Sequence, residues 1–92
     1  MDQQGLTIEG PPGTAEIRWG YHVAARLGAW GVHNDTLSAG VVDADLLRLA
    51  QPGLTFAVVR PNGLPWTWPI VQLTLIGDQQ LTATLGPKER VH

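Results

Sequence analysis

Apolar and polar residues alternate along the first half of the chain, from Ala15 to Leu27. Odd positions are apolar and even positions are mostly polar or small, which is typical of a strand with one buried face. The pattern predicts one long, half-buried strand over residues 15–27. Gly28 is predicted to mark a bulge or bend, because the apolar parity changes there to include Trp30.

A helix at about 15–31 is the alternative for this segment. Helical spacing also connects four of its apolar residues, Trp19, Val23, Leu27 and Trp30. Three glycines in the segment argue against it, because each would cost a helix up to about 1 kcal/mol. The corresponding alternative fold is α+β, with this helix packed on a β-meander.

The middle of the chain predicts a turn, a returning strand and one short helix. The turn is HNDT at residues 33–36, and the strand covers 37–42. A helix over 43–51 follows, with Asp43 as its N-cap and a Pro-Gly pair after its end. Its predicted apolar side consists of Leu46, Leu47, Leu49 and Ala50.

The C-terminal half predicts an antiparallel meander of three strands, at residues 54–59, 64–76 and 80–85. A three-residue loop at 61–63 suits Pro and Gly in its first and last places. This loop predicts four pairs, Arg60–Leu64, Val58–Trp66, Phe56–Trp68 and Leu54–Ile70. A loop at 77–79 predicts three more, Leu75–Leu81, Leu73–Ala83 and Val71–Leu85.

Two features of the central strand indicate a corner with one open edge. The apolar positions are even up to Ile70 and odd from Val71 onward, so the inward face changes there. Pro65 and Pro69 are both predicted to direct their missing N–H groups toward the same open edge. The fold expected is therefore mainly β: a small open barrel or strongly bent antiparallel sheet of five to six strands, with one short helix.

A chain of 92 residues predicts a single domain. Residues 1–13 end in GPPG and predict a flexible N-terminal arm, although residues 6–8 could add a short edge strand. The remaining residues, 14–92, are predicted to form one β-rich domain.

Composition excludes several classes of function. The chain has no cysteine, which excludes disulfides, thiolate zinc sites and cysteine nucleophiles. A net charge of −2 without a basic stripe makes nucleic acid an unlikely partner. No apolar run approaches the roughly 18 residues of a membrane span, and the first residues lack a secretory signal pattern. We therefore expect a cytoplasmic protein with no membrane partner.

Aromatic residues provide the strongest candidate for a ligand site. Tryptophan rings bind sugars, bases and cations by stacking, but four of the six aromatic residues considered lie on the apolar parity of predicted strands, which favours the core. A speculative site at the barrel mouth would use Trp66, Trp68 and Tyr21 for stacking and Arg60 as a charged anchor.

Polar residues offer no convincing catalytic or metal site. His22 and His33 lack a third ligand at suitable spacing, so no metal and no cofactor are predicted. Ser38, His33 and Asp35 surround one turn, but adjacency in a turn is not a catalytic triad. His22 shares the polar parity with Arg18, Arg26 and Glu16, and this polar face is expected to be solvated, with anion binding as the alternative.

The function expected is a small non-enzymatic binding or interaction module that self-associates, with a homo-oligomer or another protein as the partner. Its charged fraction of 15% is low against roughly 25% in typical domains, which suggests an additional surface contact. A dimer contact would show apolar residues such as Trp30 or Leu64 exposed. The alternatives are a small-molecule-binding domain using tryptophan stacking, and an enzyme whose site is assembled between subunits.

Overall fold

The computed structural model describes residues 7–11, 13–61, 64–77 and 79–87. In chain order, its elements are β1 (Thr7–Gly10), β2 (Ala15–Trp19), β3 (His22–His33), β4 (Thr36–Ala44), α1 (Leu46–Leu49), β5 (Leu54–Val58), β6 (Trp66–Ile76) and β7 (Gln80–Leu85). The prediction of a mainly β fold with one short helix is confirmed. The alternative with a helix at 15–31 is wrong, because that range forms β2 and most of β3.

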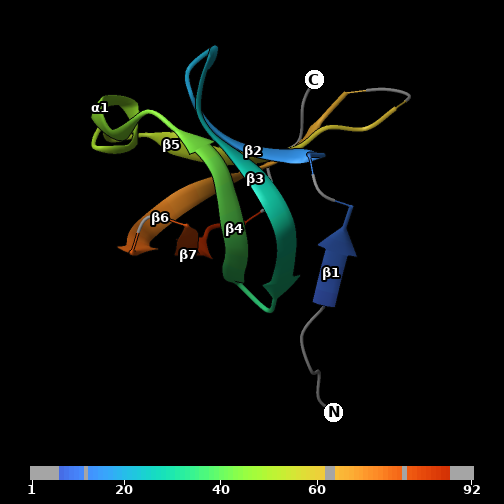
Figure 1. Cartoon of the computed structure of the whole chain (residues 1–92). Coiled ribbons are helices and arrows are strands. Elements are labelled where there is room, and N and C mark those ends of the chain that lie inside the picture. The colour runs from blue at the N-terminus through green and yellow to red at the C-terminus, as the bar shows by residue number, and fades with distance from the viewer. Residues whose placement is uncertain (1–6, 12, 62–63, 78, 88–92) are drawn as a thin grey trace.

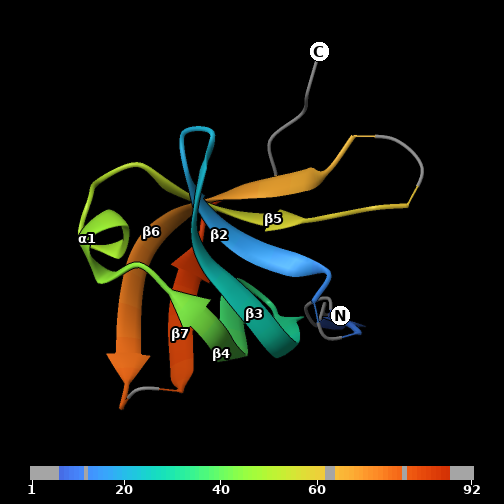
Figure 2. The same ribbon diagram turned by 45° about the horizontal axis from the view of Figure 1, so that its top comes forward.

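Six of these strands close into an antiparallel barrel (Figures 1 and 2). Neighbours are paired in the order β3, β2, β5, β6, β7, β4, and β4 returns to pair with β3. The barrel is therefore closed, whereas the sequence indicated an open barrel or a bent sheet. The remaining strand, β1, adds to the same edge of β3 beyond the start of β2. It lies within the predicted arm; residues 1–6 and 12 of that arm are outside the described residues.

The single strand predicted over 15–27 is wrong, because the chain reverses inside it. Gly20 and Tyr21 form a two-residue turn that joins β2 to β3 as a hairpin. Gly20 has a φ of +62°, a left-handed conformation that glycine adopts without steric cost. The hairpin places the two halves of the predicted strand side by side.

A β-bulge explains why the sequence alternation passes through this turn without a break. Ile17 pairs with Ala25 while Arg18 pairs with Val23, so Ala24 is an extra residue of β3. A two-residue turn makes odd positions pair with even ones, and one extra residue restores odd with odd. Odd positions therefore enter the core from both strands.

The helix lies inside the predicted range 43–51 but begins later. Its N-cap is Asp45 rather than Asp43: the Asp45 carboxylate accepts hydrogen bonds from two backbone N–H groups of the first turn, at 3.1 and 3.3 Å. Asp43 is still in β4, where it lies opposite Arg26. The strand continues past its predicted end because its pairing with β3 extends to Ala44.

The registers predicted for the C-terminal strands are largely confirmed. Four predicted pairs are present: Val58–Trp66, Phe56–Trp68, Leu73–Ala83 and Leu75–Leu81. Three residues of the predicted hairpin loops, Asn62, Gly63 and Asp78, lie outside the described residues.

A β-bulge in β6 forms the predicted corner. Ile70 pairs with Leu85 and Gln72 pairs with Thr84, so Val71 is the extra residue and is 71% exposed. The predicted pair of Val71 with Leu85 is therefore wrong. The change of inward parity at Ile70 is confirmed, because one extra residue turns the following positions over.

The edge marked by the prolines is partly covered. Pro69 lies opposite Thr55, and its carbonyl accepts a hydrogen bond of 2.8 Å from the Gly86 N–H. The segment after β7 therefore continues the sheet at Pro69, where the sequence predicted an open edge.

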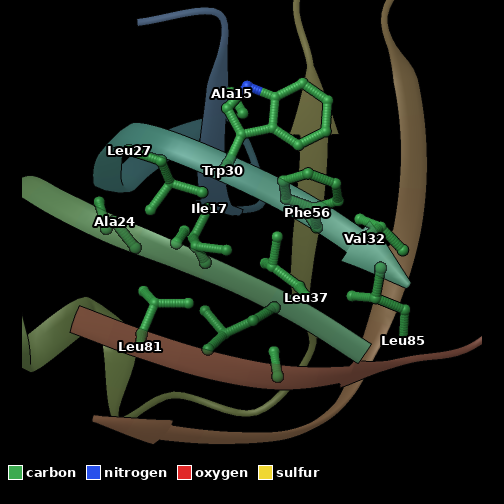
Figure 3. Close-up of a cluster of buried hydrophobic side chains, with 14 of the residues drawn as sticks. Ala15, Ile17, Ala24, Leu27, Trp30, Val32, Leu37, Phe56, Leu81 and Leu85 are labelled. Carbon is green, nitrogen blue, oxygen red and sulfur yellow. The ribbon is translucent and has the colours of Figure 1, made fainter. Parts of the chain in front are cut away.

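Apolar side chains from several strands meet inside the barrel (Figure 3). The largest that are fully buried are Phe56, Ile17, Leu27, Leu37 and Leu81. Trp30 packs edge-on against Phe56 with ring centroids 5.6 Å apart, and its indole N–H donates to the Thr14 hydroxyl at 3.2 Å. Among the described residues no polar or charged residue is buried. Hydrophobic burial is therefore the main stabilising term of this barrel.

Candidate functional site

The structure brings together part of the predicted aromatic site. The Arg60 guanidinium carbon lies 4.9 Å from the ring centroid of Trp66, within the range of a cation–π contact. Trp68 follows on the same strand, with its ring 5.3 Å from that of Phe56. Both tryptophans are half-buried and pack against the core. Both rings therefore contribute to the packing of the barrel, and only part of each is accessible to a ligand.

Tyr21 lies at the other end of the barrel from Trp66. It is fully exposed in the β2–β3 turn, next to Trp19, which pairs with the first residue of β5. Trp66 pairs with the last residue of β5. Four residue steps of about 3.3 Å each therefore separate the two positions along β5, so Tyr21 cannot stack on a ligand held between Arg60 and Trp66.

The polar face predicted on β2 and β3 is built from ion pairs. Arg18 pairs with Glu16, and Arg26 pairs with Asp43 at 3.4 Å. His22 is at the start of β3, with its ring 6.1 Å from that of Trp19. Because both arginines of this face already contact carboxylates, a bound anion would have to compete with these partners.

The two histidines lie apart, whereas His33, Asp35 and Ser38 line one hollow at the β3–β4 turn. His22 and His33 occupy opposite ends of β3. His33 is hydrogen-bonded through Nδ1 to the Thr7 hydroxyl at 2.8 Å, whereas Ser38 lies opposite Gly31 on the neighbouring strand. Within the described ranges, no group of three or more His, Cys, Asp or Glu side chains is placed to hold a metal ion.

Exposed apolar side chains are the most distinctive surface feature. In this antiparallel barrel the ends of β2, β4 and β6 lie beside the starts of β3, β5 and β7. Figures 1 and 2 show α1 between the β2–β3 hairpin and the end of β6. We call the large exposed apolar residues here the apolar end: Trp19, Tyr21, Val42, Leu46, Leu47, Leu75 and Ile76.

Leu46 and Leu47 are adjacent on α1 at the apolar end and are 65% and 81% exposed. The sequence placed both on the buried side of a nine-residue helix together with Leu49, but only Leu49 is buried. Successive residues in a helix point about 100° apart, so Leu47 and Leu49 lie on nearly opposite sides of α1. For Leu47, helical geometry could have revealed this from the sequence.

Of the two residues expected to be exposed at a dimer contact, one is exposed and the other is buried. Leu64 is 59% exposed, as a dimer contact requires, whereas Trp30 is 6% exposed and belongs to the core.

Comparisons with protein-family models, curated proteins and solved structures gave no significant match. The described part of the chain contains no helix with the length and apolar character needed to cross a bilayer.

Proposed function

We propose that this chain is a small, non-enzymatic interaction module that self-associates through its apolar end. The observation that carries the proposal is the gathering of seven of the ten large exposed apolar side chains of the described residues at that end. Isolated exposed leucines are common on monomers, but several large exposed apolar side chains at one end favour a partner that covers them.

The charges around the apolar end favour a second copy as that partner. Arg26 is paired with Asp43 at 3.4 Å, and Arg48 with Asp45 at 3.6 Å. These four side chains have no net charge, so two identical ends can face each other across a two-fold axis without like-charge repulsion. A strongly charged end would instead favour a partner of opposite sign.

The same pairings argue against a nucleic-acid partner. Three of the described arginines contact carboxylates, and Arg60 lies over Trp66. Nucleic-acid binding requires lysine or arginine side chains that neutralise phosphates and release their counterions. The guanidinium groups of these arginines already have partners within the chain. The cytoplasmic location and the lack of enzymatic activity remain predictions.

Molar mass in solution tests the proposal. The wild-type chain is expected to have at least twice its single-chain mass of 9.9 kDa in light scattering, with the value rising with concentration. Substituting Leu46→Gln together with Leu47→Gln should return one chain's mass. Because both side chains are exposed, the fold should lose no more than about 0.5 kcal/mol per substitution.

Leu64→Gln provides the control, because Leu64 is also largely exposed but lies at the opposite end of the barrel. This variant is expected to associate like the wild type. A wild-type mass of one chain at millimolar concentration would refute self-association. Equal loss of association in both variants would show that the contact is not specific to the apolar end.

A further inference from the structure

The outer face of β1, β3 and β4 has a hollow of about 710 Å³ beside the β3–β4 turn. Pockets for small ligands typically have about 300–1,000 Å³. One wall comes from β1, the strand outside the closed barrel, and the opposite wall comes from β4. The hollow therefore exists because the seventh strand is added to the barrel.

Strand register places two rows of side chains across the hollow. Glu9 on β1 lies opposite Gly31 on β3, and Gly31 in turn lies opposite Ser38 on β4. The second row consists of Thr7, His33 and Thr36. The hydrogen bond of 2.8 Å between Thr7 and His33 Nδ1 fixes the imidazole ring against the β1 wall.

Neither backbone conformation nor packing requires glycine at position 31. Its φ lies outside the left-handed region, and a Cβ there would be 3.5 Å from Glu9 Cγ and from the Ile8 carbonyl oxygen, an ordinary contact distance. Glycine inside a strand is destabilising relative to alanine. Because Gly31 has no side chain, the hollow is deeper between Glu9 and Ser38.

The chemistry of the lining selects a class of ligand. Hydroxyl groups of Thr7, Thr36 and Ser38 both donate and accept hydrogen bonds, and the carboxylates of Glu9 and Asp35 accept them. Lysine and arginine do not occur among the described residues of the lining, so it has no cation for an anionic ligand. The two carboxylates are exposed, and exposed ion pairs contribute little to binding a cation.

We propose that this hollow binds a neutral polyhydroxylated ligand, such as a mono- or disaccharide. The hydroxyl groups of the ligand would bind the rows of Thr, Ser and carboxylate side chains. Its apolar C–H face would lie on Gly31 and Ala29. The hollow is at the opposite end of β3 from the apolar end, so this inference does not depend on self-association.

Amide chemical shifts of ¹⁵N-labelled protein test the proposal. Glucose, galactose, N-acetylglucosamine, maltose and cellobiose are titrated separately, and tetramethylammonium serves as the cationic probe. At least one sugar is expected to give saturable shifts confined to residues 7–10 and 29–38. Gly31→Val should abolish them by filling the floor, and Ser38→Ala should weaken binding about two- to tenfold by removing one hydrogen bond.

Two variants separate binding from folding. Gly31→Ala tests whether the strand accepts a side chain at this position, and its amide spectrum should remain that of the folded barrel. Thr55→Ala, on β5, a strand that does not line the hollow, should bind like the wild type. The proposal is overturned if no sugar gives saturable shifts at the hollow, if only the ammonium probe does, or if Gly31→Val and Ser38→Ala bind unchanged.

Discussion

Trp30 shows how single residues fix this barrel. It pairs with Gly10 on one side and Ala39 on the other, and its ring packs on Phe56. Gly10 has no side chain where a Cβ would lie 2.2 Å from Trp30 Cζ2. The indole ring therefore occupies the space beside β1, which joins the seventh strand to the core.

Gly10→Ala is predicted to destabilise the protein by about 1–3 kcal/mol, because the added methyl group must displace the Trp30 ring or β1. Urea unfolding followed by tryptophan fluorescence measures this. Gly31→Ala is the control in the neighbouring strand, where the added Cβ has contacts of 3.5 Å and should cost nothing. If both variants unfold at the same urea concentration, the close packing on Trp30 is not a constraint.

For single residues, the sequence predicted most of the strand registers of the C-terminal hairpins correctly, but it predicted the wrong residue as the helix N-cap. Val58–Trp66 and Leu75–Leu81 followed from the loop lengths, because turn residues restrict how many positions a hairpin can skip. Asp43 and Asp45 are equally good caps by residue type. The choice between them depends on how far β4 stays paired with β3, which is a long-range contact.

Among the elements, β6 depends most on one inserted residue. Residues 66–69 pair with β5 and Ile70 already pairs with β7, so the bulge at Val71 directly follows the change of partner. The sequence revealed this corner because the apolar parity changes within one strand. The turn in the β2–β3 hairpin escaped detection, because the bulge at Ala24 restores the alternation that the turn at Gly20 and Tyr21 would have broken.

Deleting Val71 is predicted to abolish cooperative folding. Without the bulge, the residues after it turn over, so Leu73, which packs against the core, would face solvent while Gln72 and Thr74 turned inward. Circular dichroism during heating measures the loss of the transition. Val71→Thr keeps the bulge and replaces a side chain that is 71% exposed, so it should melt within a few degrees of the wild type. A cooperative transition in the deletion variant would contradict the role given to the bulge.

For the whole molecule, closure of the barrel required information that local patterns do not contain. The pairing of β4 with β7, which closes the barrel, joins segments far apart in the chain, and the hydrophobic pattern is compatible with several partners for β4. The apolar end was hidden for the same reason. Its residues come from four separate segments, and only the topology brings them to one end.

Cross-linking of single cysteines tests the central claim, that two copies meet through their apolar ends. The chain has no native cysteine, so Leu47→Cys and Leu64→Cys each introduce one reactive group, at opposite ends of the barrel. With a short bis-maleimide, Leu47→Cys is expected to give covalent dimers on a denaturing gel, and Leu64→Cys is expected to give single chains. Dimers of Leu64→Cys alone, or single chains for both variants, would contradict the claim.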